Sequence, residues 1–274
     1  MKLGSSSPII GITTYGRNTD DQVYLFANYL DALRRAGAVP ILLPPGEHQC
    51  DRLLSLIDGL VLTGGGDIDP QRYGGSGHPT IYRVDPERDR FEMHLAQLAL
   101  QQPKPILGIC RGLQLLSLVS GAQTLVPHIP DVFGTQTLHR TEQARPIEHP
   151  VYLNPGSRLA ALMGSETISV VSWHHQAVDV PVPGWTVTGR AADGLLEAME
   201  HDIHPWAIAV QWHPEMSHPD DPHQSALLTA FVRAAQASQV VDPVAAPILD
   251  AASVPGVAPV SCGDGSPDPP GYCS

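Results

Sequence analysis

The sequence is short of basic residues and of long apolar runs. It has 16 Lys and Arg against 28 Asp and Glu, a formal net charge of −12 over 274 residues. Because a negative surface repels phosphate backbones and anionic bilayers, neither nucleic acid nor a membrane is an expected partner. No stretch approaches the ~18 continuous apolar residues of a membrane helix, and the first residues lack the apolar core of a secretory signal. We therefore expect a soluble, cytoplasmic protein.

Cysteine is also scarce. The four cysteines are Cys50, Cys110, Cys262 and Cys273, and no two of them form a CxxC pair. This spacing favours neither a disulfide framework nor a zinc knuckle. What the chain does contain is 42% apolar residues, enough to build a sizeable core at this length.

Apolar runs alternate along the chain with amphipathic segments. Strands are predicted at residues 8–15, 39–44, 59–62 and 105–109, and helices at 25–36, 50–57, 87–102 and 111–121. After Gly121, shorter β-like runs at 168–171, 185–190, 195–200 and 207–212 lead to a last helix at 222–237. This order predicts an α/β fold with a mostly parallel central sheet and helices on both faces, in three αβα layers.

The composition changes at Val240. From there on the chain has no Lys or Arg, is rich in Pro, Gly and Ala, and shows neither helical nor strand periodicity. We expect one domain over residues 1–239 and a flexible tail over 240–274. Cys262 and Cys273 then belong to the tail, as incidental exposed thiols or an adventitious disulfide rather than a tether for a partner.

The segment "GICRG" at residues 108–112 places a cysteine between two glycines where a predicted strand turns into a helix. Glycines tolerate the backbone angles of such a bend, which presents the Cys110 side chain instead of packing it. The N–H groups and the dipole of the following helix favour a thiolate and can stabilise an oxyanion. These features predict a nucleophile, with a buried core cysteine as the alternative.

A thiolate nucleophile needs a base, and the base needs an acceptor that orients it. The segment "AIAVQWHPE" offers both, because a mostly apolar run leads to His213 and Glu215 lies two positions further on. Alone, His213 would be read as a core or surface histidine. With Cys110 in its bend, the two residues predict a Cys-His-Glu triad.

Five segments carry a resemblance to a known family. They are "GICRGLQLL", "AVQWHPE", "LTGGGDIDPQRYG", "DPERDRFE" and "VSWHHQAVD". Together they resemble the gamma-glutamyl-gamma-aminobutyrate hydrolase family of the class I glutamine amidotransferase-like superfamily. The resemblance covers roughly residues 8 to 236 and implies that superfamily's flavodoxin-like fold. It makes Cys110 the nucleophile, His213 the base and then the acid, and Glu215 the orienting carboxylate.

The resemblance also implies further site residues. The oxyanion hole would be the N–H of Arg111 and one N–H from the "GGGD" turn, most simply Gly65, although three glycines also suit a plain tight turn. Gln114 would contact the glutamyl part of the substrate. His175 and Gln176 would line the pocket, with a structural role as the alternative for His175.

Arg88 and Asp89 stand at the head of the predicted helix 87–102. A solvated helix face is the expected setting for such a charged segment. The alternatives are pairing with each other or with the α-amino and α-carboxylate groups of a substrate, and neither residue enters the predicted catalytic set.

The expected activity is hydrolysis of the γ-glutamyl amide bond of a small substrate, such as γ-glutamyl-γ-aminobutyrate from putrescine breakdown, through a γ-glutamyl thioester. No metal or organic cofactor is expected. Histidines crowd the second half, at positions 174, 175, 201, 204, 213, 218 and 223. None shows H-E-x-x-H or another established ligand spacing.

Three alternative functions stay open. A glutaminase subunit would use the same triad to supply ammonia to a partner synthase, and a poly-γ-glutamate hydrolase of the folate type would share the mechanism but usually has secretory features. An inactive ligand-binding relative would have lost the chemistry. The sequence does not identify the leaving amine, and a homodimer is the expected assembly by default.

Overall fold

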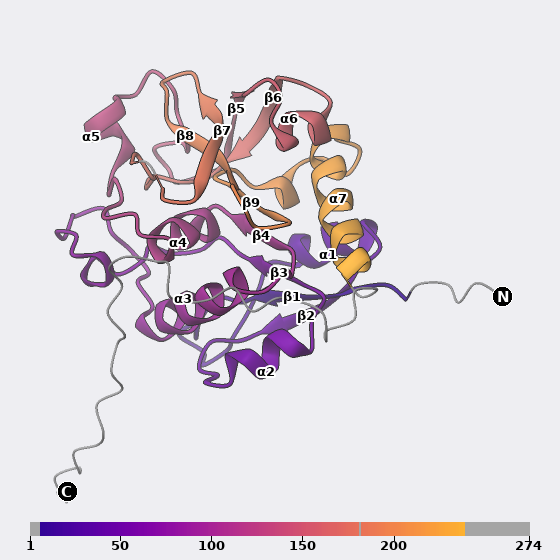
Figure 1. The fold of residues 1–274 in the computed structure, drawn as a ribbon. Coiled ribbons are helices and arrows are strands. Elements are labelled where there is room, and N and C mark those ends of the chain that lie inside the picture. The colour runs from indigo at the N-terminus through magenta and orange to yellow at the C-terminus, as the bar shows by residue number, and fades with distance from the viewer. Residues whose placement is uncertain (1–5, 181, 239–274) are drawn as a thin grey trace, which may run out of the picture. The chain divides into compact units, whose positions relative to one another are not determined.

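A computed structural model describes residues 6–180 and 182–238 of the chain (Figure 1). The predicted tail at 240–274, with Cys262 and Cys273, lies outside the described residues, so the domain boundary at 239 stays a prediction. Within the described part no helix is long and apolar enough to cross a bilayer.

The centre of the fold is a nine-stranded sheet of order β2-β1-β3-β4-β9-β8-β7-β5-β6. The strands are β1 (Ile9–Thr13), β2 (Val39–Leu43), β3 (Gly59–Leu62), β4 (Ile106–Ile109), β5 (Ile147–Leu153), β6 (Thr167–Ser172), β7 (Trp185–Ala191), β8 (Leu196–His201) and β9 (Ala207–Val210). The first five in spatial order are parallel, and from β9 onward each pair is antiparallel.

Helices cover both faces of the parallel half (Figure 1). They are α1 (Ala27–Arg35), α2 (Cys50–Ser55), α3 (Pro86–Leu100), α4 (Arg111–Val119) and α7 (Pro222–Ser238). The short helices α5 (Ile129–Phe133) and α6 (Arg158–Met163) lie with the antiparallel strands, and η1 (Pro70–Tyr73) and η2 (Pro214–Met216) are short 3-10 helices. Because strand side chains alternate, Val61 packs with α1 and α7 while its neighbours Leu60 and Leu62 pack with α2, α3 and α4. The predicted three-layer α/β fold is confirmed.

The sequence did not reveal β5, α5 or α6. In β5, "IEHPVYL", a charged residue, a histidine and Pro150 interrupt the apolar pattern, so the segment does not look like a strand. It forms one because only alternate residues, His149, Val151 and Leu153, are buried, as suits an antiparallel strand with one face covered. Helices α5 and α6 are too short for a helical period to show.

The junction of β4 and α4 is closely packed against β3. A Cβ at Gly112, the second residue of α4, would overlap the carbonyl oxygen of Leu62 in β3. A Cβ at Gly108 would lie 2.7 Å from a methyl carbon of Leu116 and 3.0 Å from the Gly112 backbone. Both glycines are therefore required by close approach of the helix to the sheet.

We expect Gly112→Ala to destabilise the protein by about 1–3 kcal/mol, because the new methyl group must push α4 away from β3. Urea unfolding measures the change. The control is Gly77→Ala, where a Cβ meets nothing within 4 Å. Equal stability of the two variants would contradict the packing argument.

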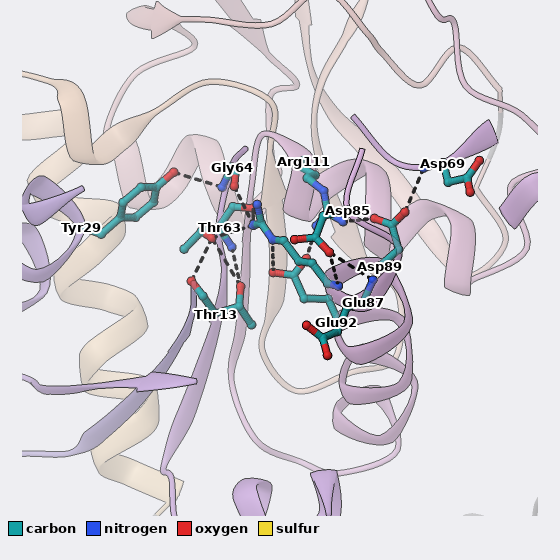
Figure 2. Close-up of polar contacts among 11 residues, drawn as sticks. Thr13, Tyr29, Thr63, Gly64, Asp69, Asp85, Glu87, Asp89, Glu92 and Arg111 are labelled. Carbon is teal, nitrogen blue, oxygen red and sulfur yellow. Dashed lines mark hydrogen bonds and ion pairs between the residues drawn. The ribbon is translucent and has the colours of Figure 1, made fainter. Parts of the chain in front are cut away.

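A buried ion cluster joins α3 to α4 (Figure 2). Arg88, Asp89, Glu92 and Arg111 are each at most 3% exposed. Arg111 forms ion pairs with both Asp89 and Glu92, and Arg88 Nε donates to Glu92 Oε1 at 3.1 Å. The expected solvated face at Arg88 and Asp89 is therefore wrong. The two residues also do not pair with each other, because the helix turns both inward against α4 and the end of β3.

The cluster also holds the chain that follows β3. Arg88 Nη2 donates to the Gly64 carbonyl at 2.7 Å and to Thr63 Oγ1 at 3.0 Å. Burial alone would raise the pKa of Glu92, but Arg111 and Arg88 outweigh burial and lower that pKa below its ordinary value. Glu92 is thus the carboxylate that compensates two buried guanidinium groups.

Glu92→Gln should cost about 3–5 kcal/mol at neutral pH, because it leaves buried positive charge uncompensated. The contribution of Glu92 should be fully present above the pKa of an unfolded glutamate and be lost as the pH falls through the lower, folded pKa. Urea unfolding of both proteins from neutral to acid pH should show the gap closing. Exposed Glu142→Gln is the control, and a gap that widened in acid would contradict the charge argument.

Candidate active site

A cavity of about 620 Å³ opens at the carboxyl ends of the parallel strands. Its walls come from the loops after β1, β3, β4 and β9 and from the segment 82–88 that leads into α3. Ligands of open α/β sheets bind at this edge. Cys110, His213 and Glu215 all line the cavity.

Cys110 lies in the bend between β4 and α4 with φ 52° and ψ −103°. Side chains other than glycine rarely adopt a positive φ, and such a conformation persists only when the surroundings impose it. Here the Cys110 N–H donates to the carbonyl of Val210 in β9 at 2.8 Å, and α4 starts at the next residue. The residue is 5% exposed. The bend thus directs the thiol to the floor of the cavity.

His213 follows β9 and is fixed from two sides. Its N–H donates to the Val171 carbonyl in β6 at 2.8 Å, and its Nδ1 lies 2.6 Å from Glu215 Oε1. The preceding Trp212 is fully buried and donates through Nε1 to Gln224 of α7 at 2.9 Å. Nε2 of His213 is buried without a hydrogen-bond partner. A donor Nδ1–H toward Glu215 leaves this Nε2 as the atom available for chemistry.

Gly64, in the glycine turn after β3, lies close to the side chains of both Cys110 and His213. A Cβ there would lie 2.8 Å from Cε1 of His213 and 3.5 Å from Cβ of Cys110. The two side chains are thus close neighbours across this glycine. Any larger residue at position 64 would force the imidazole out of place.

The charge state of His213 follows from its neighbours. Burial favours the neutral ring, but Glu215 and Cys110 outweigh it and raise the pKa of His213 well above its ordinary value. These two neighbours therefore favour the doubly protonated form of the His213 imidazole. A cationic imidazole beside a thiol is the arrangement that favours a thiolate.

The predicted oxyanion donors also reach the cavity. Gly65 has φ +146°, a conformation natural only to glycine, and lines the cavity together with Arg111. The N–H of Gly64 is already bound to Tyr29 Oη at 3.1 Å (Figure 2). The N–H groups of Gly65 and Arg111 have no protein acceptor among the described residues. Two unpaired N–H groups flanking a thiol can stabilise an oxyanion.

Three predicted substrate contacts do not line the cavity. Gln114 is buried and donates to the Gln176 carbonyl at 3.1 Å and to Gln211 at 3.3 Å. His175 is buried behind the wall, with Nε2 3.0 Å from Asp67 Oδ2, and Asp67 itself lines the cavity. Gln176 is fully enclosed. In this position the three residues support the cavity wall from behind. Their direct contact with substrate stays a prediction.

Sequence reasoning missed the aromatic residues of the cavity. Tyr15, Tyr24 and Phe26 pack in tilted or edge-to-face contacts, with ring centroids 5.0–6.4 Å apart, and Trp173 lines the same cavity near His213. Arg88 lies over the Tyr15 ring at 5.1 Å. Tyr15 follows β1 by two residues, a position at the carboxyl edge of the sheet that would have identified it.

A second polar cluster lies away from the cavity. His139, His149, His174 and Glu197 are buried, and one ligating atom from each lies within 4.8 Å of all the others. None of the four lines the cavity. Among the described residues, these four side chains form the cluster whose nitrogen and oxygen atoms could hold a metal ion.

The chain matches one protein-family model and is similar to several known proteins. A family model described as Peptidase C26 matches residues 8–215. A Mycobacterium tuberculosis protein provisionally named a glutamine amidotransferase is 39% identical over 224 residues, covering 78% of this chain and 72% of that protein. The gamma-glutamyl-gamma-aminobutyrate hydrolase PuuD of Escherichia coli K12 is 31% identical over 246 residues, covering 84% and 94%.

A solved structure supports the same fold. It comes from Thermoplasma acidophilum and is described provisionally as one component of a GMP synthase; the TM-score is 0.59 at 18% identity, over 85% of this chain and 96% of that one. At this identity the likeness concerns the fold alone. With the family model and the relatives above, it confirms the resemblance drawn from the motifs: the chain belongs to the Peptidase C26 family of class I glutamine amidotransferase-like proteins.

Proposed function

We propose that the protein is a cysteine-dependent hydrolase of small γ-glutamyl amides, with Cys110, His213 and Glu215 as its triad. The observation that carries the proposal is the meeting of these three side chains at one cavity, with the His213 Nε2 unpaired beside the thiol. The family supports hydrolysis in general. The triad and the γ-glutamyl substrate are the proposed refinement.

In the first half-reaction the Cys110 sulfur attacks the γ-carbonyl carbon, forming an S–C bond and moving the carbonyl electron pair onto oxygen. The N–H groups of Gly65 and Arg111 bind that oxyanion. When the intermediate collapses, the C–N bond breaks and His213 gives its proton to the departing amine. A γ-glutamyl thioester and a free amine result.

In the second half-reaction the neutral His213 takes a proton from water as the water oxygen attacks the thioester carbon. Collapse of this second intermediate breaks the S–C bond and releases glutamate, and the thiolate and imidazolium are regenerated. Glu215 keeps the ring oriented and stabilises its charge through both halves. No further proton donor is needed, because one imidazole alternates between its two states.

Arg88 is the best placed group to recognise the glutamyl half. Its Nε and Nη2 are bound within the protein, whereas Nη1 has no acceptor among the described residues and lies against Gly65. Arg88 lines the cavity, so Nη1 can pair with a substrate α-carboxylate. Acidic side chains of the same cavity, Asp85 and Glu87, suit the α-amino group of such a zwitterion.

γ-Glutamyl-γ-aminobutyrate is the substrate that we favour, because the PuuD relative is named for its hydrolysis. This substrate would place the chain in putrescine breakdown. Supply of ammonia to a partner synthase is the second candidate, favoured by the provisional amidotransferase name of the Mycobacterium relative. It would require the chain to act on glutamine in preference to other γ-glutamyl amides.

Purified protein should release glutamate from γ-glutamyl-γ-aminobutyrate, and Cys110→Ala should lower the rate at least about 10⁴-fold by removing the nucleophile. Glutamate is measured over a panel that also holds glutamine and γ-glutamylglycine, and release of γ-aminobutyrate is followed for glutaryl-γ-aminobutyrate. Cys50→Ala is the matched control, because this second buried cysteine begins α2 away from the cavity.

The panel separates the candidates. Activity on glutamine alone would replace the hydrolase by the ammonia-supplying subunit. Equal rates with the glutaryl and glutamyl amides would refute recognition of the α-amino group. Full activity of Cys110→Ala would refute the whole proposal.

Glu215→Gln should lower kcat/KM at neutral pH about 100-fold or more and move its alkaline limb to lower pH. The amide still accepts the Nδ1–H bond, but without the carboxylate charge the raised pKa of His213 falls. His213 then deprotonates at a lower pH, and the neutral ring cannot protonate the leaving amine. Profiles of kcat/KM against pH for both proteins, with exposed Glu166→Gln alongside, test this; an alkaline limb that stays in place would contradict it.

A further inference from the structure

The buried cluster of His139, His149, His174 and Glu197 has no place in the proposed chemistry. His139 lies in the loop before β5, His149 in β5, His174 just after β6 and Glu197 in β8. These four segments meet in the antiparallel half of the sheet, where β5 pairs with both β6 and β7 and β7 pairs with β8. All four side chains are more than nine-tenths buried.

The polar atoms that face one another here have no partner outside the cluster among the described residues. Nδ1 of His139, Nε2 of His149, Nε2 of His174 and both carboxylate oxygens of Glu197 are buried, and their contacts are ion pairs within the cluster, from the three ring nitrogens to Glu197 Oε1. Buried polar atoms without partners are rare in proteins, and each one costs stability. Five buried polar atoms that have no partner outside their own cluster indicate a bound cation that accepts their lone pairs.

The spacing of these atoms suits a small cation. Glu197 Oε1 lies 3.0 Å from His139 Nδ1, 3.5 Å from His174 Nε2 and 3.7 Å from His149 Nε2. Four ligands bound tetrahedrally to zinc at ~2.0–2.1 Å are about 3.3–3.4 Å apart. The observed separations bracket that value.

The outer ring nitrogens are held as metal ligands require. His149 Nδ1 lies 3.1 Å from the Pro150 carbonyl, His174 Nδ1 lies 3.0 Å from the Gln176 carbonyl, and His139 Nε2 lies 2.9 Å from Asp193 Oδ2. Histidines that bind metals give their other N–H to a carbonyl or a carboxylate in this way, which fixes the tautomer and the ring. Each of the three nitrogens that face Glu197 is then a lone-pair donor.

We propose that His139, His149, His174 and Glu197 form a closed, structural site for one Zn²⁺ ion. Imidazole nitrogens suit zinc, and the charges of Glu197 and Asp193 together balance a divalent cation. The four ligands fill a tetrahedral shell and none lines the cavity, so the ion has no position open to substrate. The sequence analysis expected no metal because it found none of the established ligand spacings, and the proposed site departs from that expectation.

The position of the site gives the ion a structural task. It would tie the loop at His139 to β5, β6 and β8, next to Trp173, a wall residue of the cavity. The same strands hold the triad, because Val171 of β6 binds the His213 N–H and the Glu197 carbonyl binds the Gln211 N–H at 2.8 Å. Loss of the ion is therefore expected to lower the thermal stability of the protein.

Full-length protein, expressed with added zinc, should contain about one zinc ion per chain by elemental analysis. Treatment with a chelator should lower the melting temperature, and ZnCl₂ should restore it in a concentration-dependent manner. Cobalt added to the chelated protein should give the visible absorption bands of tetrahedral Co²⁺. None of these readouts depends on hydrolysis, so they succeed or fail independently of the proposed function.

Variants assign the ligands. His149→Gln and Glu197→Gln should each lower zinc affinity more than about 100-fold, and Asp193→Asn about 10- to 100-fold, because it only orients His139. His204→Gln is the matched control, a buried histidine bound to the Gln102 carbonyl outside the cluster, and should keep its zinc.

The proposal is overturned if the folded wild-type chain takes up neither Zn²⁺ nor Co²⁺. It is also overturned if His149→Gln retains zinc with unchanged affinity. Should a ligand variant fail to fold, metal-dependent melting and the cobalt spectrum of the wild-type chain decide the question without it.

Discussion

The bend between β4 and α4 is the constraint on which the site depends. It keeps Cys110 in a left-handed conformation that costs a side chain about 1–3 kcal/mol and persists only where the surroundings impose it. Those surroundings are β9, which binds the Cys110 N–H, and β3, which α4 approaches so closely that only glycine fits at position 112. The direction of the sulfur is therefore a property of the packed sheet.

Stability and chemistry share residues around this bend. The Arg111 backbone supplies a proposed oxyanion donor, while its side chain is buried in ion pairs with Asp89 and Glu92. Arg88, paired with Glu92, binds the carbonyl of Gly64 and so holds the glycine turn beside the thiol. A charge removed from this cluster is expected to disturb the oxyanion donors as well as the fold, since no buried arginine can be left without a carboxylate.

The antiparallel half of the sheet completes the site from the other side. Strand β6 supplies the carbonyl that fixes the His213 backbone, and the segment after β6 contributes Trp173 to the cavity wall. The proposed zinc ion lies among the strands of this half. It would stabilise a region in which polar side chains occupy the interior.

The sequence by itself predicted the parallel strands and their helices and pointed to Cys110, His213 and Glu215 as candidates, because each is marked by a local pattern: an apolar run, a helical period or a strand end. Tertiary structure decided the rest. It buried Arg88 and Asp89, which look like a solvated helix face until α4 covers them. It also placed Gln114 and Gln176 behind the cavity wall, and it brought His139, His149, His174 and Glu197 together from four segments. Local patterns report on neighbours along the chain, whereas burial and charge pairing depend on segments that meet only when the sheet forms.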